Sequence, residues 1–129
     1  MSRFVRFARG RKSVRGQKNK TEERYEVLLG NRKLAGDIQH FAYEPVRLRL
    51  AADNAFYAPD FGVLAADDVF ECHEVKAGRV NKVTGALVAI EEEAARVRRK
   101  VAAEQHPFRF MLAIERPKKL GGGFEVVEV

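Results

Sequence analysis

The sequence is poor in cysteine, lacks tryptophan and contains no long apolar run. Its single cysteine, Cys72, excludes an intrachain disulfide and a zinc site built from several thiolates. No apolar stretch approaches the roughly 18 residues that a membrane-spanning helix needs, and no signal-peptide core follows the arginines near the N-terminus. We therefore expect a cytoplasmic protein with no membrane partner.

Positive charge is concentrated at the N-terminal end of a chain whose length, 129 residues, suits one domain. Residues 1–20 hold eight Lys or Arg and no acid, whereas residues 21–129 hold the other 16 against all 18 acids. Such a block repels itself and suits contact with polyanions. We interpret residues 1–20 as a basic flexible arm and residues 21–129 as the domain; a solvated tail or a targeting sequence would have the same composition. The arm residues predicted to contact a polyanion are Arg9, Arg11, Lys12, Arg15, Lys18 and Lys20.

Hydrophobic periodicity predicts the order α, β, β, β, α, β. A first helix begins near residue 21, with Asn19 or Thr21 as its N-cap and Gly36 as its end. Strands are expected at 38–50, 56–64 and 69–76, separated by turns at 53–54 and 67–68. A second helix ends before Pro107, and a buried strand at 108–114 and an optional strand at 124–129 follow it. The predicted apolar stripe of the second helix consists of Leu87, Ile90, Ala94, Val97 and Val101.

The predicted hairpin of the second and third strands brings two carboxylates together. A turn centred near Asp67 pairs residues whose numbers sum to about 134, so Asp60 faces Glu74. Opposed side chains have Cβ atoms about 5 Å apart, and two carboxylates at that distance repel each other unless a cation lies between them. The two-residue period of a strand places Lys76 on the face of Glu74 and Val75 on the other. Oxygen ligands favour Mg²⁺, or Mn²⁺, over zinc.

A third carboxylate is predicted on the first helix. Glu22 lies about 70° from the centre of the apolar stripe and Glu23 about 170°, which makes Glu22 the inward candidate. Each motif has an ordinary structural alternative, since a Pro-Asp pair commonly forms a turn and Glu-Val-Lys commonly forms a solvated strand edge. The joint order and the predicted hairpin placement favour a site.

These residues resemble the motif of the PD-(D/E)XK nuclease superfamily: Pro59-Asp60, then Glu74-Val75-Lys76, with Glu22 on a preceding helix. Four stretches, 21–25, 35–38, 73–76 and 96–107, resemble small phage-encoded nucleases related to phage endonuclease I. The resemblance covers residues 21 to about 114 and implies a restriction-endonuclease-like α/β fold, an αβββαβ core with a mixed central sheet flanked by helices. Many relatives place Gly directly after the lysine, whereas this chain has Ala77 and then Gly78.

The resemblance implies a metal-dependent endodeoxyribonuclease that acts on branched or structured DNA, as a junction resolvase does. Asp60, Glu74 and the Val75 carbonyl would bind Mg²⁺ or Mn²⁺, Glu22 would complete the site, and Lys76 would orient or help to deprotonate the attacking water. The basic arm would contact DNA. Related enzymes are often homodimers, and a phage-encoded enzyme would act in the host cytoplasm.

Two residues of the second helix are further candidates for DNA contact. Arg96 and Lys100 lie where the small phage relatives also carry basic residues, although an ordinary solvated helix face, with Glu92 pairing to Arg96, is the alternative. His73 alternates away from Glu74, and Cys72 shows no sign of activation, so we predict structural roles for both. Competing functions are a nucleic-acid-binding module on a nuclease fold without catalysis and a virion assembly protein.

Overall fold

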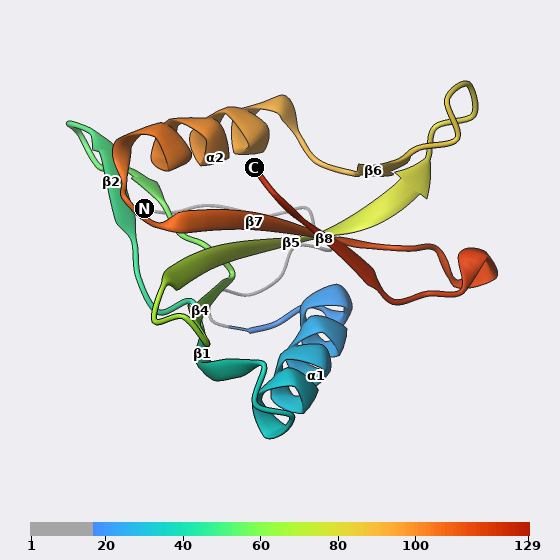
Figure 1. The fold of residues 1–129 in the computed structure, drawn as a ribbon. Helices are drawn as coiled ribbons and strands as arrows, with labels where there is room; N and C mark the ends of the chain where they lie inside the picture. The colour runs from blue at the N-terminus through green and yellow to red at the C-terminus, as the bar shows by residue number, and fades with distance from the viewer. Residues whose placement is uncertain (1–16) are drawn as a thin grey trace.

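The computed structural model describes residues 17–129, which form an α/β fold with a mixed sheet and two helices (Figure 1). Helix α1 lies against one face of the sheet and helix α2 against the other. In that part of the chain no helix is long and apolar enough to span a membrane. The elements are α1 (Lys20–Leu34), β1 (Ile38–Tyr43), β2 (Leu48–Ala51), β3 (Ala55–Tyr57), β4 (Phe61–Ala65), β5 (Phe70–Val80), β6 (Leu87–Ala89), α2 (Glu93–Gln105), β7 (Arg109–Glu115), the 3-10 helix η1 (Lys118–Leu120) and β8 (Phe124–Glu128).

The main sheet has the strand order β1-β4-β5-β7-β8, with β6 paired to the end of β5. Strands β1, β4 and β5 form an antiparallel meander, β7 runs parallel to β5, and β8 returns antiparallel to β7. Parallel pairing requires a crossover connection, and α2 provides it across one face. Strands β2 and β3 form a separate hairpin that packs against α2.

Two apolar clusters hold the helices to the sheet. The cluster under α1 contains Tyr25, Leu29, Ile38, Phe61, Val63, Val75 and Ala113. The cluster under α2 contains Leu48, Tyr57, Cys72, Ala102 and Phe110. Burial of a Val, Leu, Ile or Phe side chain contributes about 1.5–3 kcal/mol, so the two clusters stabilise both faces of the central strand β5.

The first helix begins directly after Asn19, one of the two N-cap candidates predicted from the sequence. Asn19 is the N-cap and forms a capping box with Glu22, and Lys20 is the first helical residue. Lys18 and Lys20, which we had assigned to the arm, therefore flank or belong to α1. Gly30 lies within the helix without breaking it, and the chain turns at Gly36, whose φ is 84°. Arg9, Arg11, Lys12 and Arg15 lie outside the described residues.

The expected strand at 38–50 is wrong in its continuity. It breaks after Tyr43, because Glu44 has φ 47° and Pro45 follows, neither of which continues a ladder. The segment expected as one strand at 56–64 is likewise divided at Pro59 into β3 and β4. The turn at 53–54 is confirmed, with positive φ at both Asp53 and Asn54. The optional last strand is confirmed as β8.

The predicted stripe of the second helix is also wrong. Leu87 lies in β6, Ile90 is 54% exposed in the connection, and Val97 is 47% exposed on α2. The helix begins at Glu93 and buries Arg99 and Ala102 instead. The inward face of α2 carries Arg99, which is buried because it pairs with carboxylates. A prediction from apolar residues alone places an arginine on the solvated face, so it assigns the wrong face to this helix.

Candidate active site

The motif residues Asp60, Glu74 and Lys76 line one hollow between β5, the β2–β3 hairpin and α2. This candidate active site has a volume of about 330 Å³. Asp60, Glu74 and Lys76 all line it, as the sequence predicted from the hairpin register. The remaining lining residues are Phe56, Tyr57, Ala58, Ala95 and Arg98.

The predicted register of the hairpin is confirmed. Phe61 pairs with His73 and Leu64 with Phe70, and the numbers of each pair sum to 134. Asp60 precedes β4 by one residue, and its Oδ2 accepts a hydrogen bond of 2.8 Å from the backbone N–H of Val75. Its own carbonyl accepts a hydrogen bond of 2.8 Å from Glu44 N–H. The first contact fixes the Asp60 carboxylate against β5, and the second ties the Asp60 backbone to the end of β1.

Asp60 is held in an environment that disfavours its charge. Burial, followed by the negative charges of Glu22 and Glu74, raises the pKa of Asp60 to about 8, although the Val75 N–H and Lys76 oppose this. The carboxyl therefore keeps its proton between about pH 4 and pH 8, where a free aspartic acid is already ionised. A cation next to it would reverse this effect.

Glu74 is buried and is surrounded by donors. Tyr57 Oη donates to its Oε1 at 2.9 Å, Lys76 Nζ lies 3.2 Å from its Oε2, and a guanidinium nitrogen of Arg99 lies 3.3 Å from Oε1. Burial and the adjacent Glu74 carboxylate raise the pKa of Tyr57, so the phenol keeps its proton and acts as a donor. Neither Tyr57 nor Arg99 was identified from the sequence.

Arg99 links Glu74 to a second acid at the start of α2. Its guanidinium donates to both carboxylate oxygens of Glu91, at 2.7 and 3.0 Å, while only 5% of the residue is exposed. This two-point pair lowers the pKa of Glu91 and raises that of Arg99. Glu91 lies just before the helix, eight residues from Arg99, so no helical spacing rule marks the pair.

Glu22 is buried at the N-terminus of α1, as predicted from its place on the helix. Its Oε1 accepts hydrogen bonds from Asn19 N–H at 3.0 Å and from Tyr43 Oη at 3.1 Å. Burial, then the charge of Glu22, raises the pKa of Tyr43. Tyr43 therefore remains a neutral donor to this carboxylate. Glu22 does not line the hollow, but its charge acts on Asp60.

The basic residues proposed for DNA contact have separate locations. Arg96 and Lys100 are exposed on α2 and do not line the hollow, whereas Arg98 does. Arg96 pairs with Glu93 at 3.0 Å rather than with Glu92. Lys18 lies 3.6 Å from Glu26 and stacks over the Tyr43 ring at 4.5 Å, and Lys20 is exposed.

The neighbours of Glu74 along β5 have the structural roles expected of them. His73 is fully buried on the opposite face, where Nδ1 shares a 2.6 Å hydrogen bond with Tyr25 Oη and Nε2 lies 2.7 Å from Glu71. Cys72 lies in the core, and burial raises the pKa of its thiol to about 12. Neither side chain is available for chemistry in the hollow.

The side-chain oxygens near the hollow determine whether a divalent cation could bind there. Within residues 17–129, no group of three or more His, Cys, Asp or Glu side chains is gathered closely enough to hold a metal. The oxygens near the hollow are nevertheless hard ligands, namely the carboxylates of Asp60 and Glu74. A cation between the two carboxylates would oppose the repulsion that raises the Asp60 pKa.

Comparisons of the chain with protein-family models, with curated proteins and with solved structures found no match.

Proposed function

We propose that this protein is a metal-dependent endodeoxyribonuclease that hydrolyses phosphodiester bonds in branched or otherwise structured DNA. The observation that carries the proposal is the meeting of Asp60, Glu74 and Lys76 in one hollow, with Asp60 crowded by two other carboxylates. Such crowding disfavours the ionised form of Asp60. On an ordinary solvated strand edge, carboxylates that repel each other would point apart, whereas those of Asp60 and Glu74 lie in one hollow.

The order of elements supports the same proposal. Helix α1, the meander β1, β4 and β5, helix α2 and strand β7 follow the αβββαβ order that the sequence resemblance implies. The β2–β3 hairpin, β6 and β8 are additions to that order. The hairpin contributes Tyr57 to the hollow, so one of these additions takes part in the candidate site.

The roles we assign follow from these contacts. Asp60, Glu74 and the Val75 carbonyl would hold Mg²⁺ or Mn²⁺, with Glu22 acting on the site through its charge. A bound divalent cation would lower the pKa of water and stabilise negative charge at the phosphate. Tyr57 and Arg99 would hold Glu74 in place, and Lys76 would orient or help to deprotonate the attacking water. Attack at phosphorus would break the P–O3′ bond and leave a 5′-phosphate and a 3′-hydroxyl.

The test is cleavage of labelled single strands, duplexes, flaps and four-way junctions with Mg²⁺, Mn²⁺ or EDTA. Removal of one group that stabilises transition-state charge typically costs 10²–10³-fold in rate, so we expect losses of at least about 100-fold in Asp60→Asn and Lys76→Met. Glu23→Gln is the matched control, because Glu23 is exposed on the same turn as Glu22. Cleavage that persists in both site variants, or in EDTA, would contradict the proposal.

A binding module without catalysis is the second candidate. It is favoured by the lack of a gathered metal-ligand group among residues 17–129 and by the two cations that already neutralise Glu74. It predicts salt-sensitive affinity for DNA without any metal-dependent product.

In either case we place the protein in the cytoplasm, and in the host cytoplasm if it is phage-encoded. A homodimer of the nuclease would suit paired cuts at a junction.

A further inference from the structure

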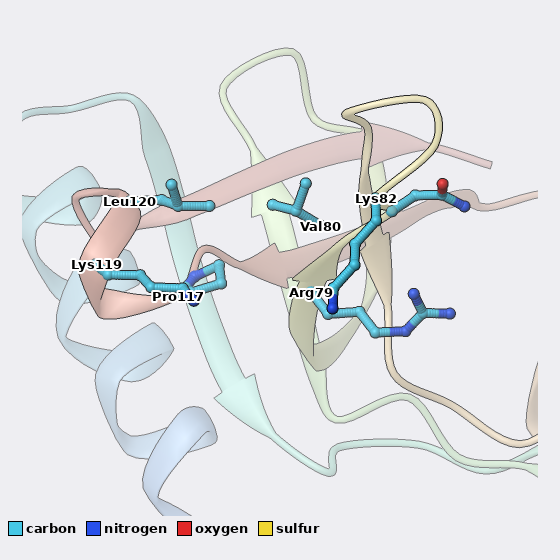
Figure 2. Close-up of a pocket in the computed structure, with 7 residues that line it drawn as sticks. Arg79, Val80, Lys82, Pro117, Lys119 and Leu120 are labelled. Carbon is cyan, nitrogen blue, oxygen red and sulfur yellow. The ribbon is translucent and has the colours of Figure 1, made fainter.

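A second hollow lies at the far end of β5, separate from the candidate active site. Its volume is about 740 Å³, and it opens between the end of β5 and the 3-10 helix η1 (Figure 2). We call it the basic pocket. It is lined by Arg79, Val80, Asn81, Lys82, Pro117, Lys119 and Leu120.

The basic pocket joins cationic and apolar surface and contains no acid. Arg79, Lys82 and Lys119 are exposed, and in the part of the chain that the structure describes none of them forms a salt bridge. Figure 2 shows Lys119, Pro117 and Leu120 on one side and Arg79 and Lys82 on the other, with Val80 between them. Three cations around an apolar floor, without acidic partners among residues 17–129, create a positive potential that favours an anionic ligand.

Both rims of the basic pocket are ordered turns. On the η1 side, Leu120 N–H donates to the Pro117 carbonyl at 2.9 Å, and Gly121 closes the turn with φ 100°. On the β5 side, the Asn81 side chain accepts from the N–H groups of Val83 and Thr84 at 2.8 and 3.0 Å. A ligand would therefore meet cations on a backbone that is already arranged, which lowers the entropic cost of binding.

The basic pocket and the candidate active site lie along one strand. Lys76 and the pocket residue Val80 are four residues apart on β5, so the two-residue period of a strand places them on the same face, about 13 Å apart at the usual rise. DNA presents one phosphate per strand every 3.4 Å of helix axis, so a DNA strand that spans both places would cover about four nucleotides. Two further cations, Arg116 and Lys118, line an adjoining hollow that shares Pro117 with the basic pocket.

We infer that the basic pocket binds the phosphate backbone of the DNA about four nucleotides from the bond that is cut. This inference rests on the proposed function for its ligand and deepens it, because it assigns to Arg79, Lys82 and Lys119 the contacts that position the substrate. Phosphate contacts fix the register of a strand without reading its sequence. The apolar floor of Val80, Pro117 and Leu120 would face the sugars of the same strand.

The experiment measures the affinity of the full chain for a labelled four-way junction and a duplex at several salt concentrations, in EDTA so that no cutting occurs. Lys82→Gln with Lys119→Gln removes two cations of the pocket. Lys33→Gln with Arg49→Gln is the control, because both residues are exposed on other parts of the fold and the charge change is the same. Lys82→Arg with Lys119→Arg restores the pocket charge.

Each phosphate contact contributes about 0.9 to the slope of log K against log salt. We expect the pocket variant to have a slope less steep by about two on the duplex, and an affinity at 0.1 M salt lower by up to about 60-fold. The control and the arginine variant should match the wild type. Wild-type slope and affinity in the pocket variant, or an equal loss in the control, would overturn the inference.

Cleavage by the same proteins in Mg²⁺ separates the two proposals. If the wild type cuts DNA and the pocket variant binds as the wild type does, the basic pocket inference fails alone. If the pocket variant loses salt-sensitive binding but the wild type cuts nothing, the pocket stands as a DNA contact and the nuclease proposal fails. A wild type that does not bind DNA overturns the pocket inference, whatever other anion the pocket takes.

Discussion

Asp60→Asn should stabilise the metal-free fold, even though the same change should abolish cleavage. The pKa of Asp60 is raised from 3.8 to about 8 by burial and by the charges of Glu22 and Glu74. Each pKa unit corresponds to about 1.4 kcal/mol, so the ionised carboxylate costs at most roughly 6 kcal/mol. Relaxation and water penetration reduce such penalties in real proteins, and we expect a gain of about 1–3 kcal/mol. The asparagine oxygen can still accept the hydrogen bond from Val75 N–H.

The sign of the pH dependence follows from the raised pKa. Between pH 4 and pH 8 the folded protein holds a proton that the unfolded chain releases, so the stability of the wild type falls as pH rises. Asp60→Asn should lack this fall. The assay is urea unfolding in EDTA at pH 5, 7 and 9, where the advantage of the variant should be smallest at pH 5 and largest at pH 9.

Asp60→Ala is the comparison that isolates the hydrogen bond, because it removes the charge and also the acceptor for Val75 N–H. A buried donor left without a partner costs about 1–3 kcal/mol, so the alanine variant should be less stable than the asparagine variant by that amount. A lower stability of Asp60→Asn than of the wild type at pH 9, or a difference that did not change with pH, would contradict a destabilising charge at Asp60.

Two further predictions concern packing around the site, and urea unfolding checks both. Arg99→Met should destabilise the fold by about 3–5 kcal/mol, because it leaves the buried carboxylates of Glu74 and Glu91 without the guanidinium. Adding Glu91→Gln to this variant should recover part of the lost stability. If the two changes in the free energy of unfolding were additive, the Arg99–Glu91 ion pair would not be the cause. Gly78→Ala should cost about 1–3 kcal/mol, since its Cβ would lie 2.5 Å from a backbone oxygen of β7. The control is Gly30→Ala on α1, where the added Cβ has no neighbour within 4 Å and should stabilise the fold by about 1 kcal/mol. Equal effects of the two substitutions on stability would contradict the close approach of Gly78 to β7.

The acids of the candidate site could be predicted from the sequence because local rules determine their placement. The turn at Asp67 and Asp68 sets the hairpin register, and a register places Asp60 next to Glu74 without any knowledge of the rest of the fold. Helical periodicity alone predicts that Glu22 points toward the sheet. These rules act over a few residues, and the structure confirms the hairpin register and the burial of Glu22, although Glu22 does not line the hollow.

The partners of those acids could not be predicted, because long-range contacts determine them. Arg99 looks like a solvated residue in a basic run, and only the buried carboxylates of Glu74 and Glu91 make its burial favourable. Tyr57 reaches Glu74 from a hairpin that forms only because the chain breaks after Tyr43. That break uses a positive φ at Glu44, a conformation that L residues other than Asn and Asp seldom adopt.

The balance of charge around the hollow gives a physical reason to expect a divalent cation there. The buried or half-buried groups comprise four acids and two bases: Glu22, Asp60, Glu74 and Glu91 against Lys76 and Arg99. With all of them ionised, the cluster has a net charge of 2 − 4, or −2. Protonation of Asp60 relieves half of that excess, which agrees with its raised pKa, whereas one divalent cation would cancel all of it. Because Glu74 already has cationic partners and Asp60 has mainly acidic neighbours, Asp60 is the carboxylate that gains most from the cation, and Asp60→Asn should weaken metal affinity more than Glu74→Gln does.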